Sequence, residues 1–485
     1  MQNQQYLLNQ NSALLLIIVV SLIFALIGIL YSRKHQGISN YLIAGRNVGT
    51  LSLTTSLAAS ALGAWILFGP ASAATWGGIG SVIGYSLGTA FPMVALIFLG
   101  TKIRKVFPKG KTLTEIIYHK FGKNLFKLIL VLIIFYMFIF LCAEVTAISM
   151  LVNYISGTPL WITAILIITT TLVYTLYGGL RASILTDNLQ FFIVIILFFI
   201  CIYYIFLFNS EDSFFHVVKT NSQHLLSHNY VPNYTAGLTF FIAVAATNLF
   251  HQGNWQRVFA AKNEKVLKES LWISFIIIIP IVFFMGMSGI IAVSLDSKVN
   301  PDLAFFSILL KEKTYFLSVV IIVMAVSLTV STIDTLVNAI SSLVIVDGKH
   351  FYYNYKKKNF LKLSKIFIII LSFISFIIAS KGYSILYLFL LADLLCCAAV
   401  FSVFYGFYQK NLKEKNIIVS ILIGLFLGLL FFPNPDFSRS ILVGTLLPFD
   451  LFHHVISSSL LFWSFLIATL TPAIVIMAHD SFKRR

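Results

Sequence analysis

The sequence predicts an all-α integral membrane protein with 13 transmembrane helices. Of its 485 residues, 59% are hydrophobic and only 11% are charged, well below the roughly 25% charged residues of soluble domains. Thirteen apolar runs, each near the length of about 20 residues that a span needs, follow one another with short polar stretches between them. Because no stretch has the composition of a soluble domain, residues 1-485 are predicted to form a single membrane domain.

The first apolar run leads directly into Arg33 and Lys34 and lacks both a charged n-region and a small-residue cleavage site. It is therefore predicted to be a retained helix rather than a signal peptide. The cores of the predicted spans are 13-31, 50-69, 76-100, 126-152, 160-177, 185-208, 236-255, 271-294, 316-345, 365-380, 383-408, 416-432 and 456-478.

The basic residues that give the chain its formal charge of +17 are concentrated in alternate loops. If the N-terminus lies outside, all but six of the 34 basic residues fall on the inner side, which is the bias of cytoplasmic loops. The charge therefore indicates topology and no nucleic-acid partner. We expect an inner (cytoplasmic) membrane protein with its C-terminus in the cytoplasm. The six outer basic residues are Lys219, Lys298, Lys311, Lys313, Lys381 and Arg439.

Two predicted spans show signs of interruption. Residues 58-64 are mostly Ala, Ser and Gly, and a Gly-Pro pair follows. Small residues also form tight helix-helix seams, and this stretch alone favours the seam over unwinding. The two spans are 50-69 and 236-255, the second and the seventh in order, so they are separated by five positions in the series. Transporters built from two inverted repeats of five helices have interrupted helices at this separation. The unwound segments of such helices free main-chain carbonyls that can bind a cation. The polar residues of the second span are Asn248, His251, Gln252, Gly253 and Asn254.

Span 316-345 is unusually polar. Its Ser and Thr hydroxyls mean little alone, because they can bond back to the preceding turn. Asp334 is different, since a carboxylate at a helix centre carries about 2.5 to 3.5 kcal/mol of insertion penalty. Asp187 admits two interpretations: a pair with Arg181 at an inner helix end, or a partner of Asp334 in a cation site. Hard cations prefer such oxygen ligands.

Three other polar residues receive no role. Glu144 and Asp393 lie in apolar surroundings, where each is a proton-linked group, a buried acid or the partner of a polar neighbour. His251 belongs to the interrupted segment, because no second His or Cys lies at metal-ligand spacing. Phosphate-loop, dinucleotide and nucleophile-elbow patterns are absent, which argues against an ATP-driven pump or a hydrolase and predicts that the protein is not an enzyme.

Several stretches together resemble the sodium/solute symporter family, which includes bacterial proline, sialic acid and sugar symporters. Their order and spacing carry the resemblance, which covers nearly the whole chain. The stretches are SNYLIAGRNVG at 39-49, the small-residue span, KTLTEIIYHKFG at 111-122, YGGLRASILTDNLQ at 177-190, WQRVFAAKN at 255-263 and STIDTLVNAISSL at 331-343.

The resemblance implies a core of ten helices in two inverted repeats, 50-208 and 236-408, preceded by 1-49 and followed by two helices in 409-485. It places one sodium ion at Ala59, Leu62, Leu328, Ser331 and Thr332. A second sodium ion, held in some relatives, would use Asp187, Ser331, Asp334 and Thr335, although Asp334 stands where those relatives have Ser. The implied substrate residues are Gly63, Ala64, Trp65, Asn248, Gln252 and Trp255.

The function implied is sodium-coupled symport of a small polar organic solute, an amino acid such as proline, by alternating access. Two departures count against proline: Ala61 replaces an acidic residue of proline symporters, and Asn248 and Gln252 replace an aromatic residue and Pro. Urea and a small carboxylate are alternative substrates, and a solute sensor with a separate signalling partner is the alternative function. The expected partners are the solute, sodium and the lipid bilayer.

Overall fold

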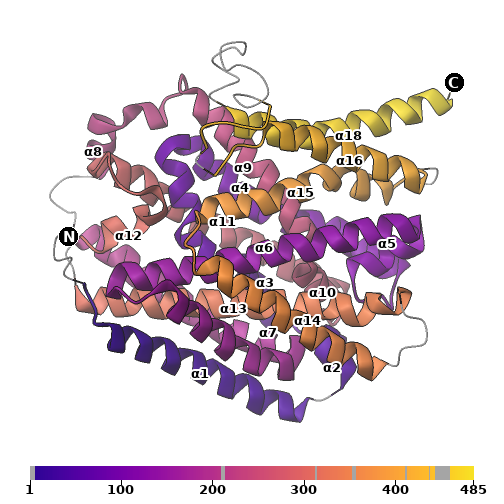
Figure 1. Ribbon diagram of the computed structural model, residues 1–485, viewed down its shortest axis with the longest axis horizontal. Helices are drawn as coiled ribbons and strands as arrows, with labels where there is room; N and C mark the ends of the chain where they lie inside the picture. The colour runs from indigo at the N-terminus through magenta and orange to yellow at the C-terminus, as the bar shows by residue number, and fades with distance from the viewer. Residues whose placement is uncertain are drawn as a thin grey trace.

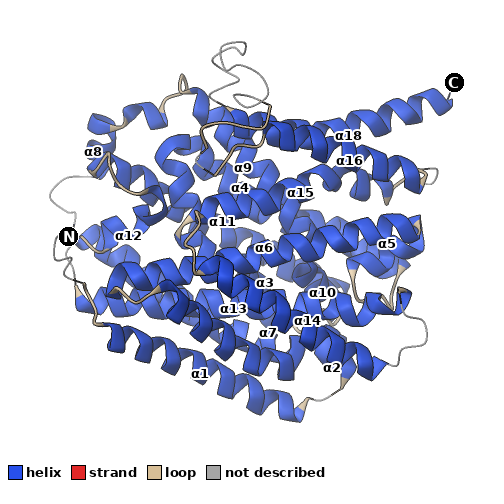
Figure 2. Ribbon diagram, viewed as in Figure 1, coloured by secondary structure: helices blue, strands red, loops and turns tan. Residues whose placement is uncertain are grey.

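The computed structural model describes residues 6–35, 37–208, 214–311, 314–351, 357–409, 412–435, 437–442 and 459–484. Within these ranges the chain is helical and contains no β-strand (Figure 2). Ten of the described helices are long and apolar enough to cross a membrane. The predicted all-α membrane fold is confirmed.

The N-terminal half begins with a capped helix, because the Asn9 side chain accepts a hydrogen bond from the Ser12 amide at 2.7 Å. Thr112 caps the short helix Leu113–Phe121 in the same way, because its hydroxyl accepts a hydrogen bond from the Glu115 amide. The elements are α1 (Gln10–Lys34), α2 (Ile38–Ile43), η1 (Ala44–Arg46), α3 (Thr50–Ala61), η2 (Ala64–Leu67), α4 (Gly69–Val106), α5 (Leu113–Phe121), α6 (Lys123–Ser156) and α7 (Leu160–Phe208).

The C-terminal half repeats this element order. In each half a broken helix is followed by a long helix, a short helix and further long helices. The elements are α8 (Phe214–Asn221), η3 (Gln223–Leu226), α9 (Val231–Phe250), α10 (Gln252–Ala260), α11 (Glu264–Leu295), η4 (Pro301–Leu303), α12 (Ala304–Leu309), α13 (Tyr315–Asp347), η5 (Gly348–His350), α14 (Lys357–Ala379), α15 (Ile385–Gly406), α16 (Glu414–Phe431) and α18 (Leu460–Arg484).

The predicted span boundaries change at two glycines. Spans 160-177 and 185-208 are two helices within α7 that follow each other without a loop and meet at a kink at Gly179 (φ 61°). Helix α4 bends at Gly78 (φ 58°), so the turns from Gly69 to this bend belong to the broken helix rather than to span 76-100. Only glycine adopts such φ values readily. Span 456-478 begins at Leu460, with residues 456–458 outside the described part, and the count of 13 spans stays a prediction.

The helices pack around α4 and α13. Helix α4 lies against α9 and α11, and α13 lies against α6, α7 and α14. A Cβ atom at Gly80 or Gly84 would collide with the backbone of α9 at Asn233 or Gly237, so small residues allow these two helices to approach closely. Figure 1 shows α1 along one edge of the bundle and α16 with α18 along the opposite edge.

The loops separate onto two ends of the bundle. At one end, Arg46 donates to the carbonyl of Gly110 at 2.7 Å, and Lys349 pairs with Glu115 at 2.8 Å. At the other end, the Leu7 amide donates to the carbonyl of Ile155 at 3.0 Å. The first end gathers loops that the charge pattern predicts to be inside, and we call it the basic end.

Candidate functional site

The first broken helix is held open by a buried carboxylate. Helix α3 ends at Ala61, and the amides of Ala64 and Trp65 donate to Glu144 of α6 at 3.1 and 3.4 Å. In a continuous α-helix those amides would donate to the carbonyls of Ser60 and Ala61. Glu144 therefore compensates the interrupted backbone, and two carbonyls lose their usual donors. This break confirms the unwinding predicted from the small residues.

The second broken helix turns at His251, between α9 and α10. The Nδ1 atom of His251 accepts a hydrogen bond from the Gly253 amide at 3.1 Å. The Asn254 side chain donates to the carbonyl of Asn248 at 3.1 Å. Side chains and a main-chain carbonyl thus satisfy the polar groups that the break exposes. The interruption lies inside the polar cluster from which it was predicted.

A central cavity of ≈ 20 Å³ lies between the two breaks. It is large enough for about one water molecule. Aromatic rings form much of its wall: Trp65 stacks on Tyr85 with centroids 5.8 Å apart, and Phe140 meets Phe389 edge-on at 4.6 Å. The lining residues are Ser60, Ala61, Trp65, Tyr85, Phe140, Val244, Thr247, Asn248, His251, Phe389 and Asp393.

Two of the six predicted substrate residues, Trp65 and Asn248, line this cavity. Gly63 lies against Glu144 and Thr332, and Ala64 is the residue whose amide binds Glu144.

The other two, Gln252 and Trp255, follow the turn at His251 and lie in α10 away from the cavity. The Gln252 side chain accepts from the Leu113 amide at 3.1 Å and donates to Ser342 at 3.2 Å. The Trp255 ring stacks on Phe404, with its Nε1 donating to the carbonyl of Leu249 at 2.8 Å.

A second, smaller cavity of ≈ 10 Å³ lies where α3, α7 and α13 meet. Four of the five residues predicted for the first sodium ion line it: Ala59, Leu62, Leu328 and Ser331. The hydroxyl of the fifth, Thr332, donates to the carbonyl of Leu328 at 3.1 Å. We call this space the α3–α13 cavity. Its remaining lining residues are Gln190, Phe191, Val194 and Ser327.

Gln190 of α7 is the unexpected member of this cavity. Its side chain is 1% exposed, and neither its Nε2 nor its Oε1 atom has a hydrogen-bond partner. A buried amide without partners is costly. The residues around the cavity carry main-chain carbonyls, hydroxyls and an unpaired amide oxygen, although the surface that faces the space in this structure is apolar. This oxygen set fits a hard cation, and the described residues contain no group of three His, Cys, Asp or Glu side chains that would fit a transition metal.

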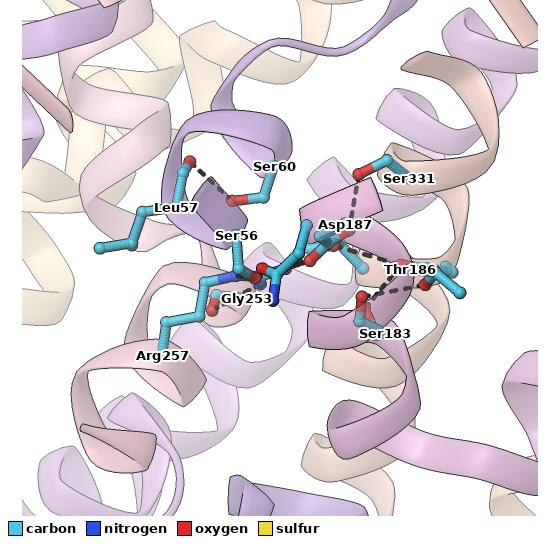
Figure 3. A network of polar contacts seen from close by, with 12 residues as sticks. Ser56, Leu57, Ser60, Ser183, Thr186, Asp187, Gly253, Arg257 and Ser331 are labelled. Carbon is cyan, nitrogen blue, oxygen red and sulfur yellow. Dashed lines mark hydrogen bonds and ion pairs between the residues drawn. The ribbon is translucent and has the colours of Figure 1, made fainter. Parts of the chain in front are cut away.

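Asp187 forms a buried ion pair with Arg257 of α10 (Figure 3). Arg257 donates to Asp187 at 2.6 Å, and the hydroxyls of Ser56 and Ser331 also donate to this carboxylate at 2.6 Å each. Both charged side chains are 0% exposed. The alternative pairing with Arg181 is wrong, because Arg181 donates instead to the carbonyl of Ala44 at 2.8 Å.

Asp334 is surrounded by hydroxyl groups rather than by a charged partner. Thr335 links it to the ion pair, because the Thr335 hydroxyl accepts from Arg257 at 2.9 Å and approaches Asp334 at 3.4 Å. Of the four residues predicted for a second sodium ion, Asp187 and Thr335 thus bind the Arg257 guanidinium directly. The donors to Asp334 are Ser183 and Tyr174 at 2.7 Å each, Thr186 at 3.2 Å and Thr335.

Sequence reasoning missed the partners of these acids. Arg257 was counted with the inner-loop charges, because it directly follows an apolar span. Glu144 and Asp393 were singled out as intramembrane acids without roles; Glu144 binds the first break, and Asp393 lines the central cavity. Gln190 gave no signal of its own, since one amide in an apolar helix is compatible with many contacts.

A vestibule of ≈ 500 Å³ opens at the end opposite the basic end. Its wall includes Trp76, and the Phe240 ring lies 5.9 Å from Trp76 and 4.6 Å from Tyr85 of the central cavity. These rings separate the two spaces. Asp302 is the one charged residue among the vestibule's described lining, and burial raises the pKa of its carboxyl above 3.8 even though Ser72 donates to it.

Hydrogen bonds between loops and helices close the path from the central cavity to the basic end. The Val48 amide donates to the carbonyl of Ala260 at 3.1 Å, and the Lys262 amide donates back to Val48 at 3.0 Å. The hydroxyls of Thr112 and Thr114 donate to Asp347 of α13. The structure therefore pairs an open vestibule at one end with a sealed polar layer at the other.

Comparison with known proteins agrees with this architecture. The profile of the "Sodium:solute symporter family" matches residues 41–424. A spermidine transporter of Candida albicans is 27% identical over 383 residues, which cover 78% of this chain and 71% of that protein. A sodium/myo-inositol cotransporter of Bos taurus is 23% identical over 445 residues, covering 82% of this chain and 66% of that protein.

Two solved structures share the fold. A Na⁺-coupled sialic acid symporter, in a substrate-bound outward-open state, superposes with a TM-score of 0.72 at 16% identity and covers 96% of both chains. A nucleobase-cation-symport-1 family transporter in a closed conformation gives a TM-score of 0.55 at 14% identity, covering 91% of this chain and 96% of that one. The chain is a multi-pass membrane protein that belongs to the sodium:solute symporter family and couples transport to sodium.

Proposed function

We propose that the protein imports a small polar organic solute by alternating access, driven by sodium that enters with it. One observation carries the proposal. The last turn of α3 and its C-cap Leu62 line both cavities: Ala59 and Leu62 line the α3–α13 cavity, while Ser60 and Ala61 line the central cavity. An ion and a solute would therefore order the same four residues, which is a physical basis for coupling.

In this proposal sodium is held by the main-chain carbonyls of Ala59, Leu62 and Leu328 and the hydroxyls of Ser331 and Thr332. The amide oxygen of Gln190 completes the set, which accounts for its lack of a protein partner. Helices α3 and α13 come from different halves of the chain. Sodium would stabilise the state in which these helices meet, and it shifts the conformational equilibrium only by its difference in affinity between states.

The proposal assigns one sodium ion to each cycle. Arg257 already places a positive charge against Asp187 and Thr335, so two of the four predicted second-sodium residues are engaged with a fixed cation. A second sodium ion at this position would meet the repulsion of a buried guanidinium. Asp334 in turn is satisfied by four hydroxyl donors.

The solute is proposed to pass from the vestibule through the central cavity to the basic end. An amino acid such as proline is one candidate, and urea and a small carboxylate are the alternatives from sequence. The relatives add two classes of candidate solute, since one relative is a spermidine transporter and another is a sodium/myo-inositol cotransporter. The positive-inside bias supports an inner-membrane location with the basic end and the C-terminus in the cytoplasm.

Uptake into proteoliposomes tests this function. The purified protein is given labelled proline, spermidine, urea, myo-inositol and acetate, with and without an inward sodium gradient. Sodium-dependent accumulation of one compound is the expected result, and Ser331→Ala should raise the sodium concentration that gives half-maximal uptake. Binding without accumulation would favour the sensor function, and accumulation independent of sodium would contradict the coupling.

A further inference from the structure

We infer that the transported solute is an organic cation whose ammonium group is bound by Asp393. This inference rests on the proposed transport function and specifies the solute that the central cavity accepts. It depends on three features of the path from the vestibule to the cavity: its charge, the environment of Asp393 and the composition of the cavity wall.

The path carries only negative formal charge. The described lining of the vestibule and the central cavity includes two carboxylates, Asp302 and Asp393, and no Lys or Arg. This contrasts with a formal net charge of +17 for the whole chain. Clefts lined by charge of one sign attract ligands of the opposite sign. The path therefore favours a cation and disfavours a free carboxylate.

Asp393 is buried without a compensating cation. Its side chain lies on α15, is 4% exposed, and receives one hydrogen bond within the described residues, from the Thr247 hydroxyl at 2.6 Å. The other intramembrane acids differ: Asp187 pairs with Arg257, and Glu144 accepts two backbone amides. A buried carboxylate with so little compensation is neutralised either by a proton or by a cationic partner, and Asp393 lines the cavity in which such a partner would sit.

The rest of the cavity wall suits an ammonium group. Trp65, Tyr85, Phe140 and Phe389 surround the space, and aromatic faces attract ligand cations. Ser60 and Ala61 also line it, and their carbonyls have lost the amides of Ala64 and Trp65 to Glu144. Carbonyl oxygens accept hydrogen bonds from N–H groups. One carboxylate, two carbonyls without their usual helical donors and an aromatic wall thus provide acceptors and no cationic donor.

With a volume of ≈ 20 Å³, the central cavity is too small for an organic solute in this conformation. A solute larger than water requires the ring stack of Trp65, Tyr85 and Phe240 to open toward the vestibule. The unbranched chain of an aliphatic amine needs a narrower opening than a sugar ring. A primary amine on a short aliphatic chain is therefore the solute class that fits both charge and shape.

The experiment compares 1,4-diaminobutane with its neutral analogue 1,4-butanediol, and adds proline, urea and acetate, in sodium-driven uptake by proteoliposomes. The full-length protein is compared with Asp393→Asn, which keeps the side-chain shape, and with Asp393→Glu, which restores the charge. Asp296→Asn is the matched control, because Asp296 is exposed and lines neither space. Thermal stability of each purified variant is measured in parallel.

The diamine should accumulate with sodium, and butanediol should not. Asp393→Asn should raise the diamine concentration for half-maximal uptake at least about thirtyfold, as expected when one partner of a buried charge pair is lost. Asp393→Glu should recover part of the affinity, and Asp296→Asn should match the wild type.

Sodium-driven uptake of urea, acetate or proline without the diamine would overturn the inference and leave the symporter function standing. Unchanged diamine affinity in a folded Asp393→Asn variant would also overturn it. If nothing accumulates, the transport function fails. The inference then stands only if the diamine raises the melting temperature of the wild type and not of Asp393→Asn, and it falls if neither protein responds.

Discussion

Gln190 shows how a single side chain changes the description of a binding site. The sodium residues expected from resemblance are carbonyls and hydroxyls of two helices, and Gln190 adds a third helix, α7. Its amide has no partner although it is almost fully buried. Asn338 shares this feature among the described residues, but Gln190 also lines a cavity, and a buried unpaired amide at a cavity points to a ligand.

Replacing Gln190 with Leu should weaken sodium binding, because one oxygen ligand is lost while the volume is nearly kept. We expect the sodium concentration for half-maximal uptake to rise by about tenfold, the effect of roughly 1.4 kcal/mol. The measurement is initial uptake rate against sodium concentration. Asn338→Leu is the control, since Asn338 is a second buried amide without side-chain partners but lies outside the α3–α13 cavity. Equal sodium dependence in both variants would remove Gln190 from the site.

The Asp187–Arg257 pair should make a larger contribution to stability than to sodium affinity. Asp187→Asn leaves the Arg257 guanidinium buried without its partner, and breaking a buried pair costs about 3–5 kcal/mol. The double variant Asp187→Asn with Arg257→Gln should recover part of that loss, because no charge remains uncompensated. Thermal unfolding in detergent gives the comparison. A double variant as unstable as the sum of the two single variants would show that the residues act independently.

At the scale of elements, the two breaks were predictable and the bends were not. Small residues at 58-64 and polar residues at 248-254 are local signals, and the chain breaks at both positions. Gly78 and Gly179 resemble many glycines of membrane helices, so nothing local marks their positive φ values. The pairing of Arg257 with Asp187 joins residues 70 positions apart, and only the packing of α7 and α10 against α13 brings them together.

The first break should depend on Glu144. Glu144→Ala would leave the amides of Ala64 and Trp65 without an acceptor, at a cost of about 1–3 kcal/mol for each buried donor. We expect a lower melting temperature and weaker sodium affinity, since the unwound segment supplies carbonyls to the α3–α13 cavity. Glu144→Gln should be milder, because its amide oxygen still accepts one hydrogen bond. An alanine variant as stable as the wild type would mean that other acceptors hold the break.

At the scale of the whole molecule, the positive charge lies at one end and the acidic path opens at the other. Composition alone predicted the membrane fold, and the loop charges predicted which loops share an end. The arrangement of Asp302 and Asp393 along one path could not be predicted, because they lie on separate elements and meet the same space only after the two halves pack together.

Asp302 should make uptake of a cation depend on the pH at the vestibule. Burial raises the pKa of its carboxyl above 3.8, so as pH falls its negative charge is lost at a higher pH than that of an exposed aspartate. Uptake of 1,4-diaminobutane at low concentration should therefore decrease on acidification of that side. Asp302→Asn should reduce uptake at neutral pH and flatten this profile. A profile of unchanged shape in the variant would assign the titration to another group.

The guanidinium of Arg257 also affects the electrical driving force. A fixed cation stays with the protein, whereas a second sodium ion would cross the membrane with every solute molecule. Each elementary charge that moves inward gains about 2.3 kcal/mol from a potential of 100 mV. With one sodium ion and a solute of charge +2, three charges enter per cycle, and the solute carries most of them. The membrane potential would then contribute more to accumulation than the sodium concentration gradient, and steady-state accumulation should follow voltage steeply.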